Sequence, residues 1–209
     1  MLIKLLDLVQ SLSWLDVSMW SSMTFYFVCF IPQIIKNFKL KSGSGVSEFL
    51  LLLYLNSYLL LMFYIFGLSL PLAYRILVPL QGLATVVLIV QRLYYEPVLQ
   101  LIALYAANIV AAASVIPLAI KNPVAIGSLF GWLAFAVILF NQLPQAIKVY
   151  REKSVAGFSF LFVFFTGLAA IIETAAAFAA PLPAQTQCTA LRGVVMFVIF
   201  CWQFVLYRW

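Results

Sequence analysis

The chain has no histidine and few charged residues of either sign. Charged side chains make up 9% of its 209 residues, hydrophobic side chains make up 66%, and the mean hydropathy is +1.12. A soluble domain of this length could not enclose so much apolar surface in one core. The composition therefore excludes an ordinary soluble domain and predicts an integral membrane protein.

The residues that usually carry catalysis are also scarce. Histidine, which titrates most readily near neutral pH, is missing, and only six Asp and Glu residues are present. The sequence has no paired carboxylates, no Gly-x-Ser-x-Gly segment and no Cys-His pair that would indicate an active site. We therefore expect neither an enzyme nor a metal site, and we expect no cofactor.

Cysteine and external modification signals are equally sparse. Cys29, Cys188 and Cys201 are an odd number of thiols at three different depths, which argues against a disulfide framework. The net charge is +6, which in a soluble protein would suggest nucleic acid, but in so apolar a chain it reflects the topology of the loops. The expected partners are a lipid bilayer and a small-molecule solute, with no nucleic acid; the oligomeric state is left open.

Seven apolar stretches of membrane-spanning length follow one another along the chain. Charged residues bracket four gaps of roughly 19 to 26 uncharged residues, Asp16 to Lys36 among them, and about 20 residues cross the hydrocarbon. Pro71, Pro97 and Pro123 stand where a new helix would begin, a position that tolerates the missing N–H. We predict helices at 16–36, 47–67, 71–92, 97–120, 124–148, 157–180 and 187–207.

Lysine and arginine are unevenly distributed between the two sides of these helices. With the N-terminus outside, eight of the twelve fall on the cytosolic side, and only Lys4 and Lys121 lie fully outside. We predict an extracytosolic segment at 1–15 and a cytosolic C-terminus, in a bacterial inner membrane or a eukaryotic endomembrane. The cytosolic residues are Lys36, Lys39, Lys41, Arg92, Lys148, Arg151, Lys153 and Arg208.

The chain contains an internal repeat with an offset of 112 residues. Without a gap, nine of the 30 aligned pairs from Trp20 to Phe49 are identical, and most of them are not common apolar residues. The offset equals four helices, so the first three recur as the last three, and the fourth restores the direction of entry. We predict an all-α integral membrane fold with two parallel three-helix bundles at 16–92 and 124–209, joined by a linker helix at 97–120.

The two matching segments each contain a Pro-Gln pair followed by a basic loop with serine and glycine. They run from Pro32-Gln33 to Ser47 and from Pro144-Gln145 to Ser159. They resemble the loops of the PQ-loop repeat family, which includes cystinosin and the mannose-phosphate-dolichol utilisation protein and shares its architecture with SWEET sugar facilitators and the KDEL receptor. The resemblance implies a transporter or facilitator for a small polar solute such as a sugar or amino acid. A non-transporting receptor, or a helper for lipid-linked sugars, is the alternative.

The Pro-Gln pairs have a physical interpretation of their own. Proline inside a helix removes one hydrogen bond and clashes with the preceding turn, so Pro32 and Pro144 predict kinks that act as hinges or gates at the cytosolic ends. A static kink is the alternative. We expect Gln33 and Gln145 to supply donors and acceptors for the freed backbone groups.

Two further pairs are related by the repeat. Gly45 and Gly157 predict tight turns before the next helices, where serine hydroxyls cap free N–H groups. Trp20 and Trp132 lie toward the outer ends of the first and fifth helices. They are interpreted as membrane-belt anchors or, alternatively, as an aromatic outer gate.

Two ionisable residues lie inside predicted helices at similar depth. Glu173 and Arg192 have three interpretations: they pair with each other, they face a cavity, or they reach toward the lipid headgroups. In the second case an unpaired Glu173 could bind a cationic solute or carry a proton. In cystinosin-like relatives an acidic residue before a Phe-Thr-Gly stretch is associated with proton coupling. Here Phe164 precedes that stretch, so we do not expect this mode of coupling.

Four amide side chains complete the set of candidate solute-binding residues. They lie near the middle of predicted helices or close to the second Pro-Gln pair, at depths where alternating-access transporters bind solutes. Hydrogen bonding between helices is the structural alternative. The four are Asn56, Gln81, Asn108 and Asn141.

Overall fold

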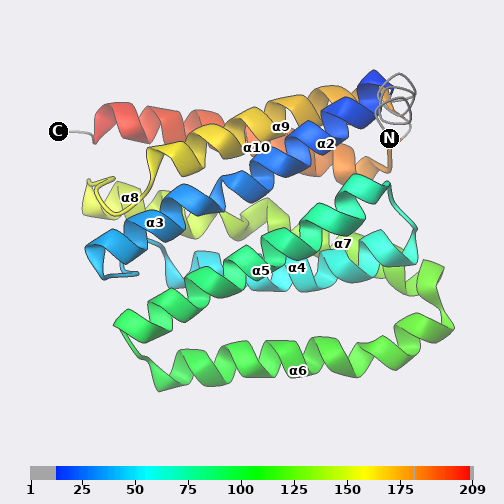
Figure 1. Ribbon diagram of the computed structural model, residues 1–209, viewed down its shortest axis with the longest axis horizontal. Helices are drawn as coiled ribbons and strands as arrows, with labels where there is room; N and C mark the ends of the chain where they lie inside the picture. Colours follow the sequence, from blue (N-terminus) through cyan, green and yellow to red (C-terminus); the bar gives the residue numbers. More distant parts are fainter. Residues whose placement is uncertain (1–12, 181, 208–209) are drawn as a thin grey trace, which may run out of the picture.

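The computed structural model describes residues 13–180 and 182–207, all of whose regular structure is helical. The kinked pairs α2 with α3 and α7 with α8 each form one span, so this part of the chain contains seven helices that could cross a membrane. Of the predicted segment 1–15, residues 13–15 alone are described, and Lys4 and Arg208 lie outside the described residues. The helices, labelled as in Figure 1, are α2 (Trp14–Val28), α3 (Phe30–Leu40), α4 (Glu48–Gly67), α5 (Leu72–Tyr95), α6 (Leu99–Lys121), α7 (Pro123–Asn141), α8 (Leu143–Glu152), α9 (Phe160–Ala179) and α10 (Ala184–Leu206).

Short polar sequences and prolines define where the spans begin. Ser13 and Asp16 form a capping box at the start of α2, in which each side chain accepts a hydrogen bond from the other residue's backbone N–H at 3.2 Å. Pro71 is the N-cap of α5, and Pro123 is the first residue of α7, as the sequence predicts. The capping box supplies hydrogen-bond acceptors for N–H groups, and proline has no N–H group. Both features matter because lipid offers no acceptor to an N–H group at a helix start.

Six of the spans form a closed ring, and the seventh stands outside it. In the first repeat α5 packs between α2 and α4, and in the second repeat α10 packs between α7 and α9. The two repeats meet through α4 against α7 and through α2 against α9. Helix α6 joins the repeats and lies at the edge of the ring, where it contacts α4 and α7 (Figure 1). The chain is thus a 3+1+3 arrangement of parallel repeats, which confirms the fold predicted from the offset.

Glycines allow α4 and α7 to pack closely. A Cβ atom on Gly131 would lie 2.5 Å from the Tyr64 ring, and one on Gly127 would lie 3.0 Å from the Cα of Gly67. Small residues spaced by one helical turn permit such close approach between membrane helices. This contact brings the two repeats together around the space enclosed by the ring.

Candidate functional site

A cavity of about 120 Å³ lies inside the ring of six spans. At one end it reaches Gln185, the second residue of α10. At the other it reaches Cys29 and Gln142, the junctions within the two kinked spans. We call the membrane end that carries the Pro-Gln pairs the PQ end, and the other the opposite end. The polar lining consists of Tyr26, Tyr54, Ser57, Tyr58, Tyr64, Tyr74, Gln81, Asn141, Gln142, Thr166, Glu173, Gln185, Thr186, Thr189 and Arg192.

The first and fifth spans are kinked next to their Pro-Gln pairs. The first is interrupted at Cys29, three residues before Pro32, and the fifth at Gln142, two residues before Pro144. A proline disrupts the hydrogen bonding of the helical turn that precedes it, and each interruption lies within that turn. The kinks therefore form where the sequence predicts them. They lie at the PQ end of the cavity.

The two Pro-Gln glutamines bind the loop of the other repeat. Gln33 accepts a hydrogen bond from the Ser159 N–H (2.8 Å) and donates to the Gly157 carbonyl (3.2 Å). Gln145 accepts from the Ser47 N–H (2.7 Å) and donates to the Gly45 carbonyl (3.3 Å). We call these four bonds the cross-repeat brace. Both glutamines are 1% exposed, so the brace is a dry, symmetric closure.

This arrangement differs from the expectation that Gln33 and Gln145 satisfy freed backbone groups of their own helices. Their side chains instead reach N–H groups at the starts of α4 and α9, which a helix start leaves without an internal partner. Each glutamine thereby caps a helix of the opposite repeat, a relation that local sequence does not indicate.

The two loops turn at Gly45 and Gly157 as expected, but glycine is needed there for a different reason. No described glycine has a positive φ, and the left-handed residues of these loops are Lys41 (φ 47°) and Lys153 (φ 51°). Gly45 and Gly157 lie backbone against backbone, so that a Cβ on either would overlap the other. Glycine is needed here because the two loops approach closely, not because the backbone turns tightly.

Two lysines extend the closure. Lys36 donates to the Phe158 carbonyl (2.9 Å), and Lys148 donates to the Ser44 carbonyl. Both bonds cross from one repeat to the other. The sequence predicts only a topological role for these lysines, because a basic loop residue normally faces lipid headgroups.

A second glutamine pair supports each kinked segment from within its own repeat. Gln91 of α5 donates to the Ile34 carbonyl (3.1 Å), and Gln203 of α10 donates to the Ala146 carbonyl (2.8 Å). Both the donors and the acceptors are separated by 112 positions, the offset of the repeat. The sequence analysis missed this pair, although the offset aligns one glutamine with the other.

An aromatic layer separates the cavity from the cross-repeat brace. The ring centroids of Phe30 and Phe162 are 5.7 Å apart at an angle of 79°, and those of Phe158 and Phe162 are 5.4 Å apart. Edge-to-face contacts of this kind are favourable for aromatic rings. All three residues are buried. The PQ end is therefore closed in two layers, one aromatic and one hydrogen-bonded.

At the PQ end of the first repeat, Arg92 is the centre of an ion-pair network. Arg92 pairs with both Glu48 and Glu96, and Glu96 accepts a hydrogen bond from Ser42 (2.9 Å). Partial burial opposes ionisation of Glu96, but the hydrogen bonds from Ser42 and Arg92 outweigh it and lower the pKa of that carboxyl. This network supports the loop that precedes α4.

Phenylalanines occupy the equivalent positions of the second repeat. Phe160 and Phe204 correspond to Glu48 and Arg92 at the offset of 112. Their rings meet edge to face at 5.3 Å. The same contact between the second and third helices of a bundle is thus ionic in one repeat and aromatic in the other.

Glu173 and Arg192 both line the cavity, and among the described residues no ion pair joins them. Glu173 accepts a hydrogen bond from the Tyr74 hydroxyl (3.2 Å), and the Tyr26 hydroxyl is a second hydrogen-bonding neighbour. Arg192 instead donates toward α7. Of the three interpretations drawn from the sequence, the geometry agrees with the one in which both residues face the cavity.

Arg192 is held by two neutral amides at the kink of the fifth span. Its Nη1 donates to Asn141 Oδ1 (2.9 Å) and to Gln142 Oε1 (3.2 Å). Its Nε is buried without an acceptor in the described part of the chain. The guanidinium therefore keeps donor capacity at the wall of the cavity.

The structure brings some of the predicted amides to the cavity and leaves others away from it. Gln81 lines the cavity and donates to the Met23 carbonyl (3.2 Å), and Asn141 lines it beside Arg192. Asn56 and Asn108 do not belong to its lining. They donate to carbonyls four residues earlier in their own helices, at 2.9 and 2.7 Å. A midspan amide can satisfy its polarity in this way without facing a solute.

Neither tryptophan of the repeat lines the cavity. Trp20 packs partly buried against an apolar cluster that includes Met19 and Tyr64, whereas Trp132 is 52% exposed on the outer surface of α7. These positions are compatible with the membrane-belt interpretation, which stays a prediction. Within residues 13–180 and 182–207 no cluster of histidine, cysteine or acidic residues could hold a metal ion.

The cavity lies around the pseudo-two-fold axis of the repeat. Many of its lining residues form pairs separated by 112 positions, and the members of each pair differ in type. The sequence analysis missed the tyrosines and threonines in this set, because such residues are equally common in membrane interfaces and helix contacts. Aligning the two repeats at the offset of 112 pairs Tyr54 with Thr166 and Tyr74 with Thr186. The pairs are Met23 with Phe135, Tyr26 with Ile138, Cys29 with Asn141, Phe30 with Gln142, Tyr54 with Thr166, Leu61 with Glu173, and Tyr74 with Thr186.

Comparison with known proteins agrees with this architecture. A family model described as PQ loop repeat matches twice, at residues 14–74 and 126–186, and the two matches are related by the same offset. The fold is similar to that in "The 3.7 A resolution structure of a eukaryotic SWEET transporter", with a TM-score of 0.66 and 16% identity, covering 94% of this chain and 99% of that one. No curated protein sequence matches significantly.

Proposed function

Because the chain belongs to the PQ-loop repeat family, we propose that it is a transporter or facilitator, and not an enzyme, that moves a small polar solute across the membrane. The two bundles rock about the central cavity, so that it opens alternately at the PQ end and at the opposite end. The proline kinks serve as hinges, and rupture of the cross-repeat brace accompanies opening of the PQ end.

The observation that supports this proposal most strongly is the position of the cavity relative to the brace. The cavity lies between the repeats and on their pseudo-axis, and it reaches toward the opposite end. At the PQ end it is limited by the aromatic layer and then by four hydrogen bonds between repeats. Bonds between repeats can break without disturbing either bundle, which is what a gate requires.

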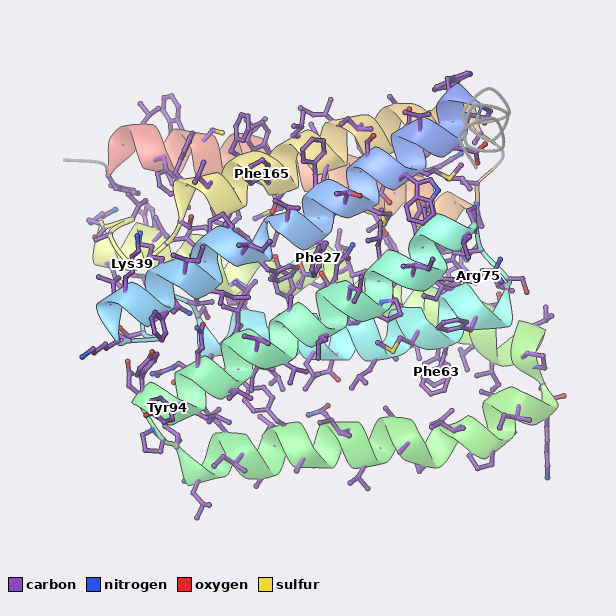
Figure 2. All side chains as sticks on the ribbon, viewed as in Figure 1. Phe27, Lys39, Phe63, Arg75, Tyr94 and Phe165 are labelled. Carbon is purple, nitrogen blue, oxygen red and sulfur yellow. The ribbon has the colours of Figure 1, made fainter. Side chains whose placement is uncertain are left out.

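We also infer that the PQ end faces the cytosol. Figure 2 shows Lys39 and Arg75 at opposite ends of the molecule. Most of the described basic residues belong to α3, α8 or the residues next to them, at the same end as Lys39. An excess of Lys and Arg marks cytosolic loops. The basic residues at the PQ end are Lys36, Lys39, Lys41, Arg92, Lys148, Arg151 and Lys153.

Flux into proteoliposomes tests the proposal directly. Purified protein is reconstituted, and uptake of radiolabelled glucose, glycerol, glycine and alanine is measured against protein-free vesicles. We expect saturable uptake of at least one solute, and we expect its loss in the Gln33→Leu/Gln145→Leu double variant. Gln100→Leu, at an exposed position of α6, is the matched control. Saturable binding without flux of any bound solute would contradict transport and favour the receptor alternative.

A further inference from the structure

We propose that the cavity binds a small zwitterion, with the cationic group of the solute at Glu173 and its anionic group at Arg192. This inference rests on the proposed function, since it names the class of solute for the same cavity. It depends on two charged side chains that line the same cavity and form no ion pair with each other in the described structure.

No cationic group of the described part of the chain lies within ion-pairing distance of the Glu173 carboxylate. The residue is 6% exposed, and its hydrogen-bonding neighbours are the neutral hydroxyls of Tyr74 and Tyr26. A carboxylate in such a position is costly unless a positive charge compensates it. Hydroxyl donors orient the carboxylate but leave its charge in place, so the cavity offers a binding position for an ammonium group.

Arg192 is the complementary case. Its Nη1 is bound by the amide oxygens of Asn141 and Gln142, which carry no charge, and its Nε is buried with no acceptor in the described structure. A guanidinium binds a carboxylate through two parallel hydrogen bonds when two of its donors are free. A solute carboxylate therefore fits the donors that the amides leave unused.

The hydrogen-bonding partners of Glu173 and Arg192 hold the two charged groups to different repeats. Glu173 of α9 is tied to Tyr74 of α5, in the first repeat, whereas Arg192 of α10 is tied to α7, in the second. A solute that carries both charges can satisfy both residues at once. A neutral sugar or polyol would leave both uncompensated, and an ion of one sign would leave one of them so.

The size of the cavity limits the solute further. An apolar cavity of about 150 Å³ holds benzene, a molecule of about six heavy atoms, and the cavity here measures about 120 Å³. Tyr54 and Tyr58 give it an aromatic wall. The class that fits both size and charge is that of amino acids with short side chains, such as glycine, alanine and β-alanine.

The first experiment uses the wild-type protein and a panel of analogues. Thermal unfolding in detergent is followed with glycine, alanine and β-alanine, with ethylamine and propionate as single-charge analogues, and with glycerol as the neutral one. We expect stabilisation by at least one zwitterion, with an affinity about thirtyfold or more above that of ethylamine or propionate. Stabilisation by glycerol or by a single-charge analogue equal to that by every zwitterion would overturn the inference.

The second experiment assigns each charge of the solute to a side chain. In Arg192→Gln we expect the advantage of the zwitterion over ethylamine to disappear, and in Glu173→Gln we expect its advantage over propionate to disappear. Arg75→Gln, at an exposed position, should keep both advantages. Because each comparison is made within one variant, a general loss of stability does not mimic the result. Retention of both advantages in both cavity variants would refute the assignment.

Flux separates a failure of this inference from a failure of transport. Uptake of a sugar or polyol without uptake or binding of any zwitterion would overturn the inference and leave transport intact. Binding of a zwitterion to the cavity residues without its uptake would support the inference and overturn transport. If a variant does not fold, the panel of analogues measured on the wild-type protein still tests the charge requirement, because it needs no substitution.

Discussion

The PQ end and the cavity share one pseudo-two-fold symmetry, but they differ in how far the repeats keep the same residues. At the PQ end, Gln33 and Gln145 are identical and make equivalent bonds. In the cavity, equivalent positions hold different residues, such as Leu61 and Glu173. When two similar loops close against each other, each makes the same bonds to the other, so both repeats need the same residues. A small solute has no two-fold symmetry, so its binding site benefits from two different walls.

Under the proposed function, the PQ end serves closure and the cavity serves solute binding. The first repeat contributes most of the cavity's aromatic wall, and the second contributes its charges and most of its amides. On this proposal, residues shared by both repeats act in closure, and residues that differ between the repeats act in solute binding.

The largest effect is expected where the two loops touch. In Gly157→Val the new side chain overlaps the Gly45 backbone, so the closed PQ end cannot form. We expect the free energy of unfolding in detergent, measured by denaturant titration, to fall by about 3 kcal/mol. Ala156→Val, at an exposed neighbouring position, is the control. Equal stability of the two variants would show that the loops do not close against each other.

The cavity should not tolerate an exchange between repeats. Glu173→Leu removes the carboxylate, and Leu61→Glu restores one at the symmetry-related position. We expect the single Glu173→Leu change to weaken solute binding by about 2 kcal/mol, and the double variant to stay equally weak, because Tyr74 binds a carboxylate only at position 173. Isothermal titration with the best solute measures this. Recovery in the double variant would mean that the walls are interchangeable.

Loss of either glutamine of the cross-repeat brace should lower the free energy of unfolding. Gln33→Leu and Gln145→Leu each remove two bonds of the cross-repeat brace and leave a buried N–H group, of Ser159 or Ser47, without its partner. Gln33→Leu also removes the bond from Gln33 to Asn37 Oδ1 (2.8 Å). In each variant the loss of the brace bonds should lower the free energy of unfolding by about 1.5 kcal/mol. Gln33→Leu should cost about 1 kcal/mol more because it also loses the bond to Asn37. A larger loss in Gln145→Leu than in Gln33→Leu, or a difference of more than about 2 kcal/mol, would contradict an equivalent role of the brace in the two repeats.

The smallest effect is expected at a contact of the PQ end that is ionic in one repeat and aromatic in the other. Replacing both Glu48 and Arg92 by Phe copies the contact of Phe160 with Phe204 into the first repeat. An ion pair can be exchanged for a well-packed apolar pair at little cost, so the double variant should stay within about 1 kcal/mol of the wild type. Arg92→Phe alone should be less stable, because it leaves Glu48 and Glu96 without their partner. A double variant less stable than this single one would show that the ionic network is required.

Much of the fold follows from the sequence because its determinants are local. Charges and prolines mark the ends of the spans, and the gapless offset reveals the repeat. The kinks follow from Pro32 and Pro144 because the effect of proline extends only over one turn. These features are therefore predictable, and the helix boundaries agree to within a few residues.

The candidate site is less predictable because its contacts are distant in sequence. Gln33 and its acceptor Gly157 are 124 positions apart, and nothing near either residue indicates the pairing. Asn56 and Gln81 have similar depth and chemistry, yet only Gln81 faces the cavity, since the rotation of a helix depends on its neighbours. Gly45 suggests a turn from its type alone, whereas its role depends on the position of the other repeat.

Thiol labelling at the two ends of the cavity tests the central claim most directly. In a background with Cys29, Cys188 and Cys201 replaced by serine, Ser47→Cys reports on the PQ end and keeps the backbone N–H that binds Gln145. Gln185→Cys reports on the opposite end. We predict that addition of a transported solute raises the labelling rate at one position and lowers it at the other. Labelling rates that rise together, or that do not respond to any bound solute, would contradict alternating access by a symmetric gate.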